Sequence, residues 1–229
     1  MVVKCGEAFF MMQQDKPIVI IGQGEVNKAA FMQLAGKSRI IALDGAAEFV
    51  MAQGFVPDAV IGDMDSFDMA DLPQASDLIQ IDEQHSNDFE KALYHFKPTM
   101  VYGIGLFGKR FDQAMANLHV MAKFHGKSQI IAITNDEIIT VHKGPIQLMA
   151  EPQGLVAIVP LMPIDFASSA GLGYGIDDMT LGFGEMISSS NHATAPQIEI
   201  VPHAHDKAAA YAICRPLSLL SALIAQYIA

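Results

Sequence analysis

Short runs of aliphatic and β-branched residues alternate with segments of helical period from residue 17 to about residue 141. We expect the runs to be buried strands; they lie at residues 18–21, 39–43, 59–61, 100–102 and 129–133. Helical periodicity marks residues 89–96 and 111–124, and in the second segment one face carries Phe111, Met115, Leu118 and Ala122. Strands that alternate with helices predict a mostly parallel sheet with helices on both faces.

The pattern changes at Gly144-Pro145. Beyond it, short alternating runs are separated by Gly, Pro, Ser and Asn, which is typical of a small antiparallel β domain. Residues 208–229 again have a helix-like pattern, interrupted by Pro216. We therefore expect an α/β domain at residues 1–143, followed by an all-β domain at residues 144–229 that ends in a helical tail.

The chain has 229 residues, of which 51% are hydrophobic and 17% charged, and this suits one large or two small globular domains. Its formal charge of −11 at pH 7 argues against a nucleic-acid partner, because such binding depends on Lys and Arg side chains that neutralise phosphates. An acidic surface favours a cationic small molecule or a metal ion.

Cys5 and Cys214 are the only cysteines, so we expect no disulfide framework and assume a reducing compartment. The N-terminal residues lack the pattern of a signal peptide. The longest apolar runs, near residues 18–22 and 217–225, are shorter than the roughly 20 residues that a membrane-spanning helix needs. The expected protein is cytoplasmic and has no membrane attachment.

Aspartates directly follow two of the predicted strands. Asp44 comes after the strand at residues 39–43, and Asp63 and Asp65 come after the strand at residues 59–61. In open parallel sheets, ligands bind beyond the carboxyl ends of the strands. In extended backbone, Asp63 and Asp65 point to the same side. They can therefore hold one divalent cation, and Mg²⁺ takes carboxylates of this kind together with substrate phosphates.

Asp88 lies at a predicted helix start, after Asn87 as N-cap and before Glu90. Taken alone, Asp88 is explained by its favourable interaction with the helix dipole. A metal site becomes the better interpretation when several aspartates converge on one edge of the sheet.

A glycine-rich loop at residues 103–108 follows a strand and precedes a helix, as in dinucleotide-binding proteins. A dehydrogenase is therefore a rival hypothesis. Against it, the first strand-turn-helix unit lacks a third glycine. In addition, Asp136 lies 28 residues after Gly108, whereas the ribose-binding acid of such proteins usually lies about 20 residues after the glycine motif. Lys109 and Arg110 follow the glycines, and two cations at a helix start suit a phosphate chain, although a tight turn with solvated side chains is the simpler alternative.

Together these segments resemble the thiamine pyrophosphokinase family. The resemblance rests on the order and spacing of four segments and is weaker in the predicted β domain. The four segments are Asp44-Gly45-Ala46-Ala47, residues 57–66, residues 84–93 with Gln84 and Asn87-Asp88, and Gly108-Lys109-Arg110-Phe111-Asp112 continuing to Asn117. In the β domain the matching places are Gly171-Leu172-Gly173-Tyr174 and Ser188-Ser189-Ser190-Asn191.

The resemblance implies an enzyme that transfers diphosphate from ATP to the hydroxyl of thiamine and releases AMP, with Mg²⁺ as cofactor. It also implies a C-terminal β sandwich and a homodimer whose thiamine sites lie between subunits. In such a dimer, an apolar tail at residues 217–228 either covers a core or lines the interface. The alternatives are a diphosphokinase for another alcohol such as a hydroxymethylpterin, an NAD-dependent oxidoreductase, and a non-catalytic nucleotide-binding module.

By the same resemblance, residues near the glycine loop and the strand ends receive roles in catalysis and ATP binding. Asp63, Asp65 and Asp88 would hold Mg²⁺, with Asp44 as a further ligand or support. Gly108, Lys109 and Arg110 would hold the phosphates, and Asp112 would fix Arg110 or the nucleotide. The hydroxyl proton would pass to Asp65 or Asp88.

The acceptor site implied by the resemblance consists of Gln84, Tyr174, Ser188, Ser190 and Asn191. The family commonly stacks a Trp on the pyrimidine ring of thiamine, whereas this chain has no Trp and carries Tyr174 at that place. The chain also departs from the family at Ala46, Asn87 and Lys109, where the family usually has Gly, Thr and Gly.

His203 and His205 would point to one face of a strand. A pair without a nearby third ligand is typical of a solvated strand edge, so we do not expect a zinc site.

Overall fold

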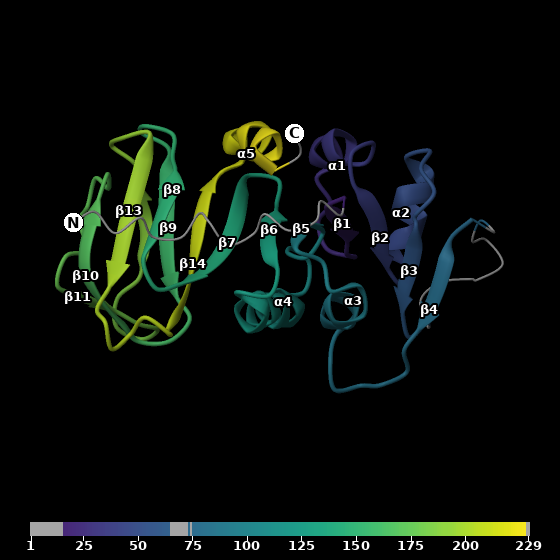
Figure 1. Cartoon of the computed structure of the whole chain (residues 1–229), viewed down its shortest axis with the longest axis horizontal. Helices are drawn as coiled ribbons and strands as arrows, with labels where there is room; N and C mark the ends of the chain where they lie inside the picture. Colours follow the sequence, from purple (N-terminus) through teal and green to yellow (C-terminus); the bar gives the residue numbers. More distant parts are fainter. Residues whose placement is uncertain (1–15, 65–72, 74, 228–229) are drawn as a thin grey trace.

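The computed structural model describes residues 16–64, 73 and 75–227, and its strands form two sheets. One sheet has ten strands in the order β12-β9-β14-β7-β6-β5-β1-β2-β3-β4, and the other has four in the order β11-β10-β13-β8 (Figure 1). The strands are β1 Ile18–Ile21, β2 Arg39–Leu43, β3 Ala59–Gly62, β4 Asp77–Gln80, β5 Met100–Ile104, β6 Gln129–Ile133, β7 Glu137–Lys143, β8 Ile146–Met149, β9 Leu155–Pro160, β10 Ile164–Ala170, β11 Met179–Leu181, β12 Ser188–His192, β13 Gln197–Pro202 and β14 Ala210–Pro216.

The N-terminal part is an α/β domain in which β1 to β6 are all parallel. Helices α1 (Lys28–Leu34) and α2 (Ala46–Ala52) pack on one face of this sheet, and α3 (Asp88–Phe96) and α4 (Phe111–Phe124) on the other. Strand β1 lies between β2 and β5, so the chain direction across the sheet reverses there. The crevice at such a reversal is the usual ligand site of this architecture.

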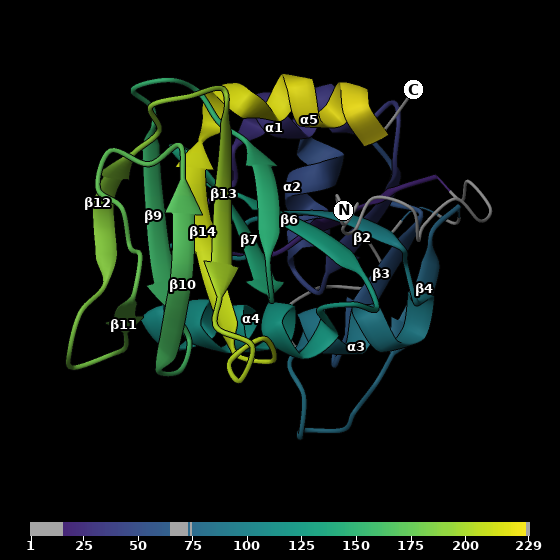
Figure 2. The ribbon, with the colours of Figure 1, turned by 60° about the vertical axis from the view of Figure 1, so that its left-hand side comes forward.

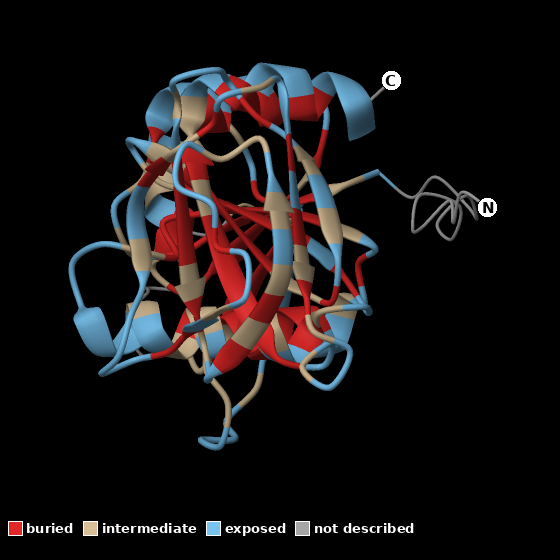
Figure 3. Cartoon of the chain, turned by 90° about the vertical axis from the view of Figure 1, so that its left-hand side faces the viewer, coloured by how far each residue is buried: buried red, intermediate tan, exposed pale blue. Residues whose placement is uncertain are grey.

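The C-terminal part is a β sandwich. Its first layer consists of β7, β14, β9 and β12, which continue the large sheet, and its second layer is the four-stranded sheet (Figure 2). Side chains from both layers form one apolar core, with Phe166 of β10, Ile200 of β13 and Tyr211 of β14 all fully buried. The buried interior between the layers is visible from the sandwich end of the molecule in Figure 3.

The mostly parallel sheet and the following β domain are confirmed, and all five predicted strands are present. The prediction of a helix-like segment from residue 208 is wrong in its first half, because β14 occupies Ala210–Pro216. This strand pairs with β7 on one side and β9 on the other, partners that are remote in sequence. Strand β4 was not expected, since its exposed edge position leaves no hydrophobic run.

The predicted apolar face of α4 is also wrong in part. Phe111 is 77% exposed and Met115 41%, whereas the buried positions are Asn117, Val120, Met121 and Phe124. Both stripes have helical spacing, and the stripe that faces the sheet includes a polar asparagine. The burial of this asparagine depends on its hydrogen-bond partners, which helical periodicity does not reveal.

The C-terminal tail forms a short 3₁₀ turn at Leu217–Leu219 and helix α5 (Leu220–Tyr227). Leu219, Leu223 and Ile224 are buried in the core that also contains α1 and α2. Of the two expected roles, the tail therefore covers a core. Within the described residues no helix is long and apolar enough to cross a membrane. The domain division at residues 143 and 144 stays a prediction.

Candidate active site

Three predicted carboxylates converge at the carboxyl edge of the parallel sheet. Asp44 follows β2 and Asp63 follows β3, and these strands are parallel neighbours. Asp88 begins α3. A Cβ atom on Gly62 would lie 3.0 Å from the Cβ of Asp44 and 3.4 Å from Oδ2 of Asp88. The end of β3 therefore passes between the two side chains, and a residue without a side chain leaves them room.

Asp44 is 2% exposed and has a φ of 45°, a conformation that L-residues other than Asn and Asp seldom adopt. Its Oδ2 accepts a weak hydrogen bond from Nε2 of Gln23 at 3.4 Å. Its Oδ1 has no hydrogen-bond partner among the described residues. A buried carboxylate oxygen without a partner is costly, so the position favours a bound cation or a donor from a ligand.

Asp88 lies in an environment that disfavours its negative charge. Burial raises the pKa of Asp88, and the nearby carboxylates of Asp63 and Asp44 raise it further, while Lys91 opposes this shift. Nζ of Lys91 lies 3.1 Å from Oδ1 of Asp88, and the Lys91 side chain is itself buried. Carboxylates that crowd together in this way form a donor set that fits Mg²⁺. Asp65 lies outside the described residues, so its place in this set stays a prediction.

The loop after β5 is held against the loop after β1. The N–H groups of Gly22, Gly24 and Glu25 donate to the carbonyls of Ile104, Gly105 and Phe107 at 2.8, 2.7 and 2.9 Å. These donors of the first strand-turn-helix unit are bonded to protein, whereas a dinucleotide-binding loop uses such groups for phosphate. This contact argues against the dehydrogenase hypothesis.

The two cations at the start of α4 have partners already. Lys109 has a φ of 51°, and its Nζ donates to the carbonyl of Gln23 at 2.8 Å. Nε and Nη2 of Arg110 donate to the two carboxylate oxygens of Asp112 at 3.1 and 2.5 Å. The hydrogen bonds raise the pKa of Arg110 and lower the pKa of Asp112. The pair is exposed, and Asp112 therefore orients a guanidinium that remains accessible to a ligand.

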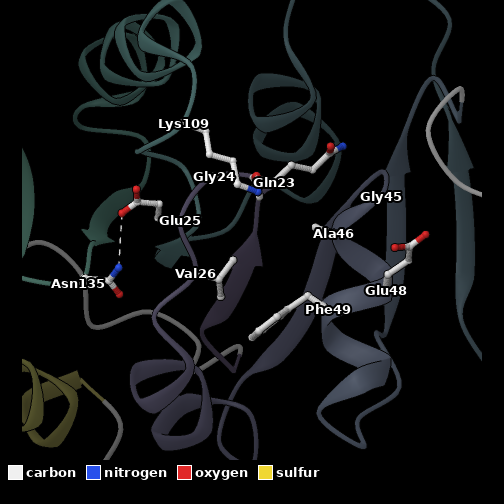
Figure 4. Close-up of a pocket in the computed structure, with 11 residues that line it drawn as sticks. Gln23, Gly24, Glu25, Val26, Gly45, Ala46, Glu48, Phe49, Lys109 and Asn135 are labelled. Carbon is white, nitrogen blue, oxygen red and sulfur yellow. Dashed lines mark hydrogen bonds between the residues drawn. The ribbon is translucent and has the colours of Figure 1, made fainter.

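An open cleft of about 530 Å³ lies beside these loops. Figure 4 shows Glu25, Lys109 and Asn135 on one side of it and Glu48 and Phe49 of α2 on the other. The cleft opens at the carboxyl ends of β1, β2 and β6, and its volume is typical of a small-molecule site. Sequence reasoning did not identify most of its lining, although the strand-end rule applies to Gln23 and Asn135 as it does to the aspartates.

Three predicted acceptor residues lie together in the β sandwich. The side chain of Asn191 is buried, accepts from the N–H of Tyr174 at 2.9 Å and donates to the carbonyl of Tyr174 at 2.6 Å. The same amide lies 3.3 Å from Oγ of Ser188. Tyr174 is 67% exposed, and its ring meets the ring of His192 edge-on at 5.5 Å. Asn191 therefore supports the Tyr174 backbone, and the Tyr174 ring is left open; Ser190 is exposed on β12.

Gln84 belongs to the other half of the molecule. It lies between β4 and α3, is exposed, and donates to the carbonyl of Asp82 at 3.4 Å. In Figure 1, β10 and β11 lie at one end of the long axis and β3 and β4 near the other, with α3 closer to the middle. Within one chain, the structure does not bring the sandwich residues of the predicted acceptor site to Gln84 or to the carboxylates.

The two histidines near the end of β13 have acidic neighbours that the sequence analysis did not anticipate. Their rings stack at 5.6 Å, and Nε2 of His205 lies 3.1 Å from Oδ2 of Asp165 and 3.5 Å from Oδ2 of Asp206. The expectation that no third ligand lies nearby is therefore wrong. Asp165 is 40 residues away in sequence and arrives through the pairing of β10 with β13.

Known proteins share both halves of this chain. Residues 31–133 match the family model "Thiamin pyrophosphokinase, catalytic domain", and residues 145–202 match "Thiamin pyrophosphokinase, vitamin B1 binding domain". Thiamin pyrophosphokinase 1 of Caenorhabditis elegans is 26% identical over 192 residues, which are 75% of this chain and 78% of that protein. Thiamine pyrophosphokinase 2 of Arabidopsis thaliana is 26% identical over 163 residues, 62% of this chain and 61% of that protein.

Solved structures share the fold. The yeast thiamin pyrophosphokinase structure has a TM-score of 0.76 at 14% identity and covers 90% of this chain and 87% of its own. The thiamine pyrophosphokinase of Bacillus subtilis has a TM-score of 0.72 at 16% identity and covers 87% of this chain and 98% of its own.

A carboxylate cluster and a cleft at the reversal point of an α/β sheet are typical of an enzyme that binds a small-molecule substrate. The two family models cover most of the chain, and they follow one another in the order of its two parts. The chain belongs to the thiamin pyrophosphokinase family, and its activity is that of a thiamine diphosphokinase.

Proposed function

We propose that the chain transfers diphosphate from ATP to the hydroxyl of thiamine, releasing AMP, with Mg²⁺ held by Asp63, Asp65 and Asp88. The observation that carries the proposal is the meeting of Asp44, Asp63 and Asp88 at one sheet edge, where Oδ1 of Asp44 is buried and has no hydrogen-bond partner in the described part of the chain. Carboxylate oxygens are the ligands that Mg²⁺ prefers. When bound, the ion would neutralise negative charge on the phosphate oxygens.

The reaction is a displacement at the β-phosphorus of ATP, which depends mainly on positioning and on stabilisation of spread negative charge. Arg110, oriented by Asp112, binds phosphate oxygens with its accessible guanidinium edge. Lys109 lines the cleft and adds a second cation there, and Gly108 keeps the loop free of a side chain beside Glu25. One of Asp65 and Asp88 accepts the proton of the thiamine hydroxyl.

The nucleotide occupies the cleft of about 530 Å³. Gln23 supports this placement because it lines the cleft and also reaches Oδ2 of Asp44. A nucleotide bound in the cleft can therefore direct its phosphates toward the carboxylates.

Thiamine lies against Tyr174, whose exposed ring suits both the aminopyrimidine and the positively charged thiazolium. Ser188, Ser190 and Asn191 support that wall, and Gln84 approaches from the α/β side. Since the two groups of residues lie in separate parts of one chain, we include a homodimer in the proposal, with the sandwich of one subunit beside the carboxylate edge of its partner. The cytoplasmic location also stays a prediction.

The test is incubation of the purified protein with ATP, Mg²⁺ and a panel of alcohols that includes thiamine and a hydroxymethylpterin. AMP and the diphosphorylated product are measured together. Asp88→Asn should reduce AMP release at least 100-fold, because the amide keeps the shape and loses the charge. Asp77→Asn, which removes an exposed carboxylate from the edge strand β4, should leave it unchanged.

AMP release with the hydroxymethylpterin and not with thiamine would show that the pterin is the acceptor. Wild-type activity of Asp88→Asn at ordinary Mg²⁺ would refute the metal site, and a chain that never forms AMP would refute the reaction.

A further inference from the structure

A chain of side-chain hydrogen bonds joins the start of α3 to the loop after β5. Nδ2 of Asn87 donates to Oδ1 of Asn117 at 2.8 Å, across 30 residues of sequence. Nδ2 of Asn117 donates in turn to the carbonyl of Leu106 at 2.6 Å. We refer to these three residues as the asparagine bridge.

Asn87 is bound at both ends of its amide. Its Oδ1 caps α3 by accepting from the N–H of Glu90 at 2.9 Å, and its Nδ2 is the donor to Asn117. The next residue is Asp88, whose carboxylate meets Asp44 and Asp63. The bridge therefore fixes the helix start that carries a metal-binding carboxylate.

The other end of the bridge fixes the loop that carries the cations. Asn117 is 7% exposed on the core-facing side of α4. The carbonyl of Leu106 is its acceptor, and the flanking carbonyls of Gly105 and Phe107 accept from the loop after β1. The middle one of three successive carbonyls is thus held by Asn117, and the two outer ones are held by backbone N–H groups of the loop after β1. These carbonyls lie directly before the segment that leads to Lys109 and Arg110.

The orientation of both amides follows from their outer partners. A backbone N–H only donates and a carbonyl only accepts, so Glu90 fixes the oxygen of Asn87 and Leu106 fixes the nitrogen of Asn117. The inner contact between the two amides is then a donor facing an acceptor. A flip of either amide would break two hydrogen bonds, and the bridge consequently has one arrangement.

We propose that the asparagine bridge is a positioning device that sets the carboxylate half of the active site against its phosphate-binding half. Asn87 and Asn117 do not touch substrate; they act through Asp88 and through the loop before Arg110. The inference rests on the proposed diphosphate transfer, in which a misplacement of about 1 Å lowers the rate roughly 100-fold. A purely structural role would instead lower stability without a specific effect on kcat.

The decisive variant is Asn87→Ser. Serine is as good an N-cap as asparagine, but its side chain is too short to reach Asn117 from the same place. We expect kcat for AMP formation to fall at least tenfold, with the KM values for ATP and thiamine changed less than threefold. Asn117→Asp, which cannot donate to the carbonyl of Leu106, should have the same kinetic effect, and the double variant should be little worse than either single one.

Asn27→Ser is the matched control. Asn27 caps α1 by accepting from the N–H of Ala30 at 2.9 Å and donates to the carbonyl of Thr134 at 3.0 Å, so it makes the same two kinds of contact. The contacts of Asn27 reach the end of β6 and do not join the carboxylates to the cations. If the two variants lose a similar amount of Tm, the kcat of Asn27→Ser should remain at least five times as high as the kcat of Asn87→Ser.

Hydrogen exchange separates this inference from the proposed reaction. In Asn87→Ser, amides of residues 105–110 should exchange faster than in the wild type, whether or not the protein forms AMP. Unchanged exchange in that loop overturns the bridge. Unchanged kcat in Asn87→Ser, additive effects in the double variant, or an equal kcat loss in Asn27→Ser overturns its positioning role. A wild type without AMP formation refutes the reaction and leaves the exchange result to decide whether the bridge exists.

Discussion

Several side chains of the site are held by neighbours before any ligand binds. Asp112 holds Arg110, Lys91 holds Asp88, and Asn191 holds the backbone of Tyr174. Each contact restricts the rotamers of its side chain before binding. The side chain therefore loses less conformational entropy when a ligand binds, and binding is more favourable than with a mobile side chain.

Arg110→Ala should weaken the use of ATP far more than that of thiamine. Loss of a charge-assisted contact to phosphate is expected to lower kcat/KM for ATP on the order of tenfold to 100-fold. Asp112→Asn, which keeps the cation and loosens its orientation, should have a smaller effect in the same direction. Steady-state kinetics with each substrate varied in turn measures this, with Lys37→Ala as a surface-charge control. A large rise in the thiamine KM at unchanged ATP kinetics would contradict the assignment.

Tyr174→Ala should raise the thiamine KM about tenfold and leave the ATP KM within twofold, because an exposed aromatic wall over a cationic ligand is lost. Tyr174→Trp should retain or improve acceptor binding, since the larger ring covers more of the ligand. Met162→Ala, another exposed side chain of the sandwich, is the control. A folded Tyr174→Ala with an unaltered thiamine KM would place the acceptor pocket elsewhere.

At the scale of elements, the loops after β1 and β5 behave as one unit. Their backbones approach so closely that a Cβ on Gly24 would lie 2.3 Å from the carbonyl oxygen of Phe107 and 2.6 Å from that of Gly105. The same backbone contact brings Lys109 to the cleft, where its Nζ reaches Gln23. The shape of the cleft therefore depends on Gly24, where any side chain would collide with backbone atoms.

Gly24→Ala should lower the free energy of unfolding by about 2 kcal/mol and raise the ATP KM, because backbone and not a flexible side chain must move. Gly36→Ala is the matched control, since a Cβ there meets nothing within 4 Å, and its stability should change by less than about 1 kcal/mol. Urea unfolding and ATP kinetics measure the two effects. Equal behaviour of the two variants would mean that the loops separate easily.

At the scale of the whole molecule, the two parts share structure across the domain division. The ten-stranded sheet runs from the α/β part into the sandwich through the antiparallel pairing of β6 with β7. The chain then returns, because α5 packs its apolar side into the core under α1 and α2. Helix α5 thus stabilises the domain that contains the carboxylates.

Leu223→Ala should destabilise that domain by about 2–5 kcal/mol, as expected for a buried leucine in a packed core. Thermal inactivation of AMP release and thermal unfolding should shift together, since the site lies on the destabilised domain. Gln226→Ala, an exposed position of the same helix, should shift neither. Unfolding of the sandwich with the α/β domain intact would show that the tail belongs energetically to the sandwich.

Features that depend on neighbouring residues were predictable from the sequence. Hydrophobic runs marked β1 to β3, β5 and β6, and the strand-end rule located Asp44 and Asp63. The cap at Asn87 and the start of α4 at Phe111 were also readable, because capping and helical period are local properties.

Features that depend on partners far along the chain were not predictable from the sequence and follow from the fold. β14 is a strand because β7 and β9 flank it, Asn117 faces the core because Asn87 and Leu106 bind it, and His205 has an acidic partner because β10 pairs with β13. In each case the local pattern was compatible with more than one arrangement. Pairing between distant segments, which local propensity does not encode, selected one of them.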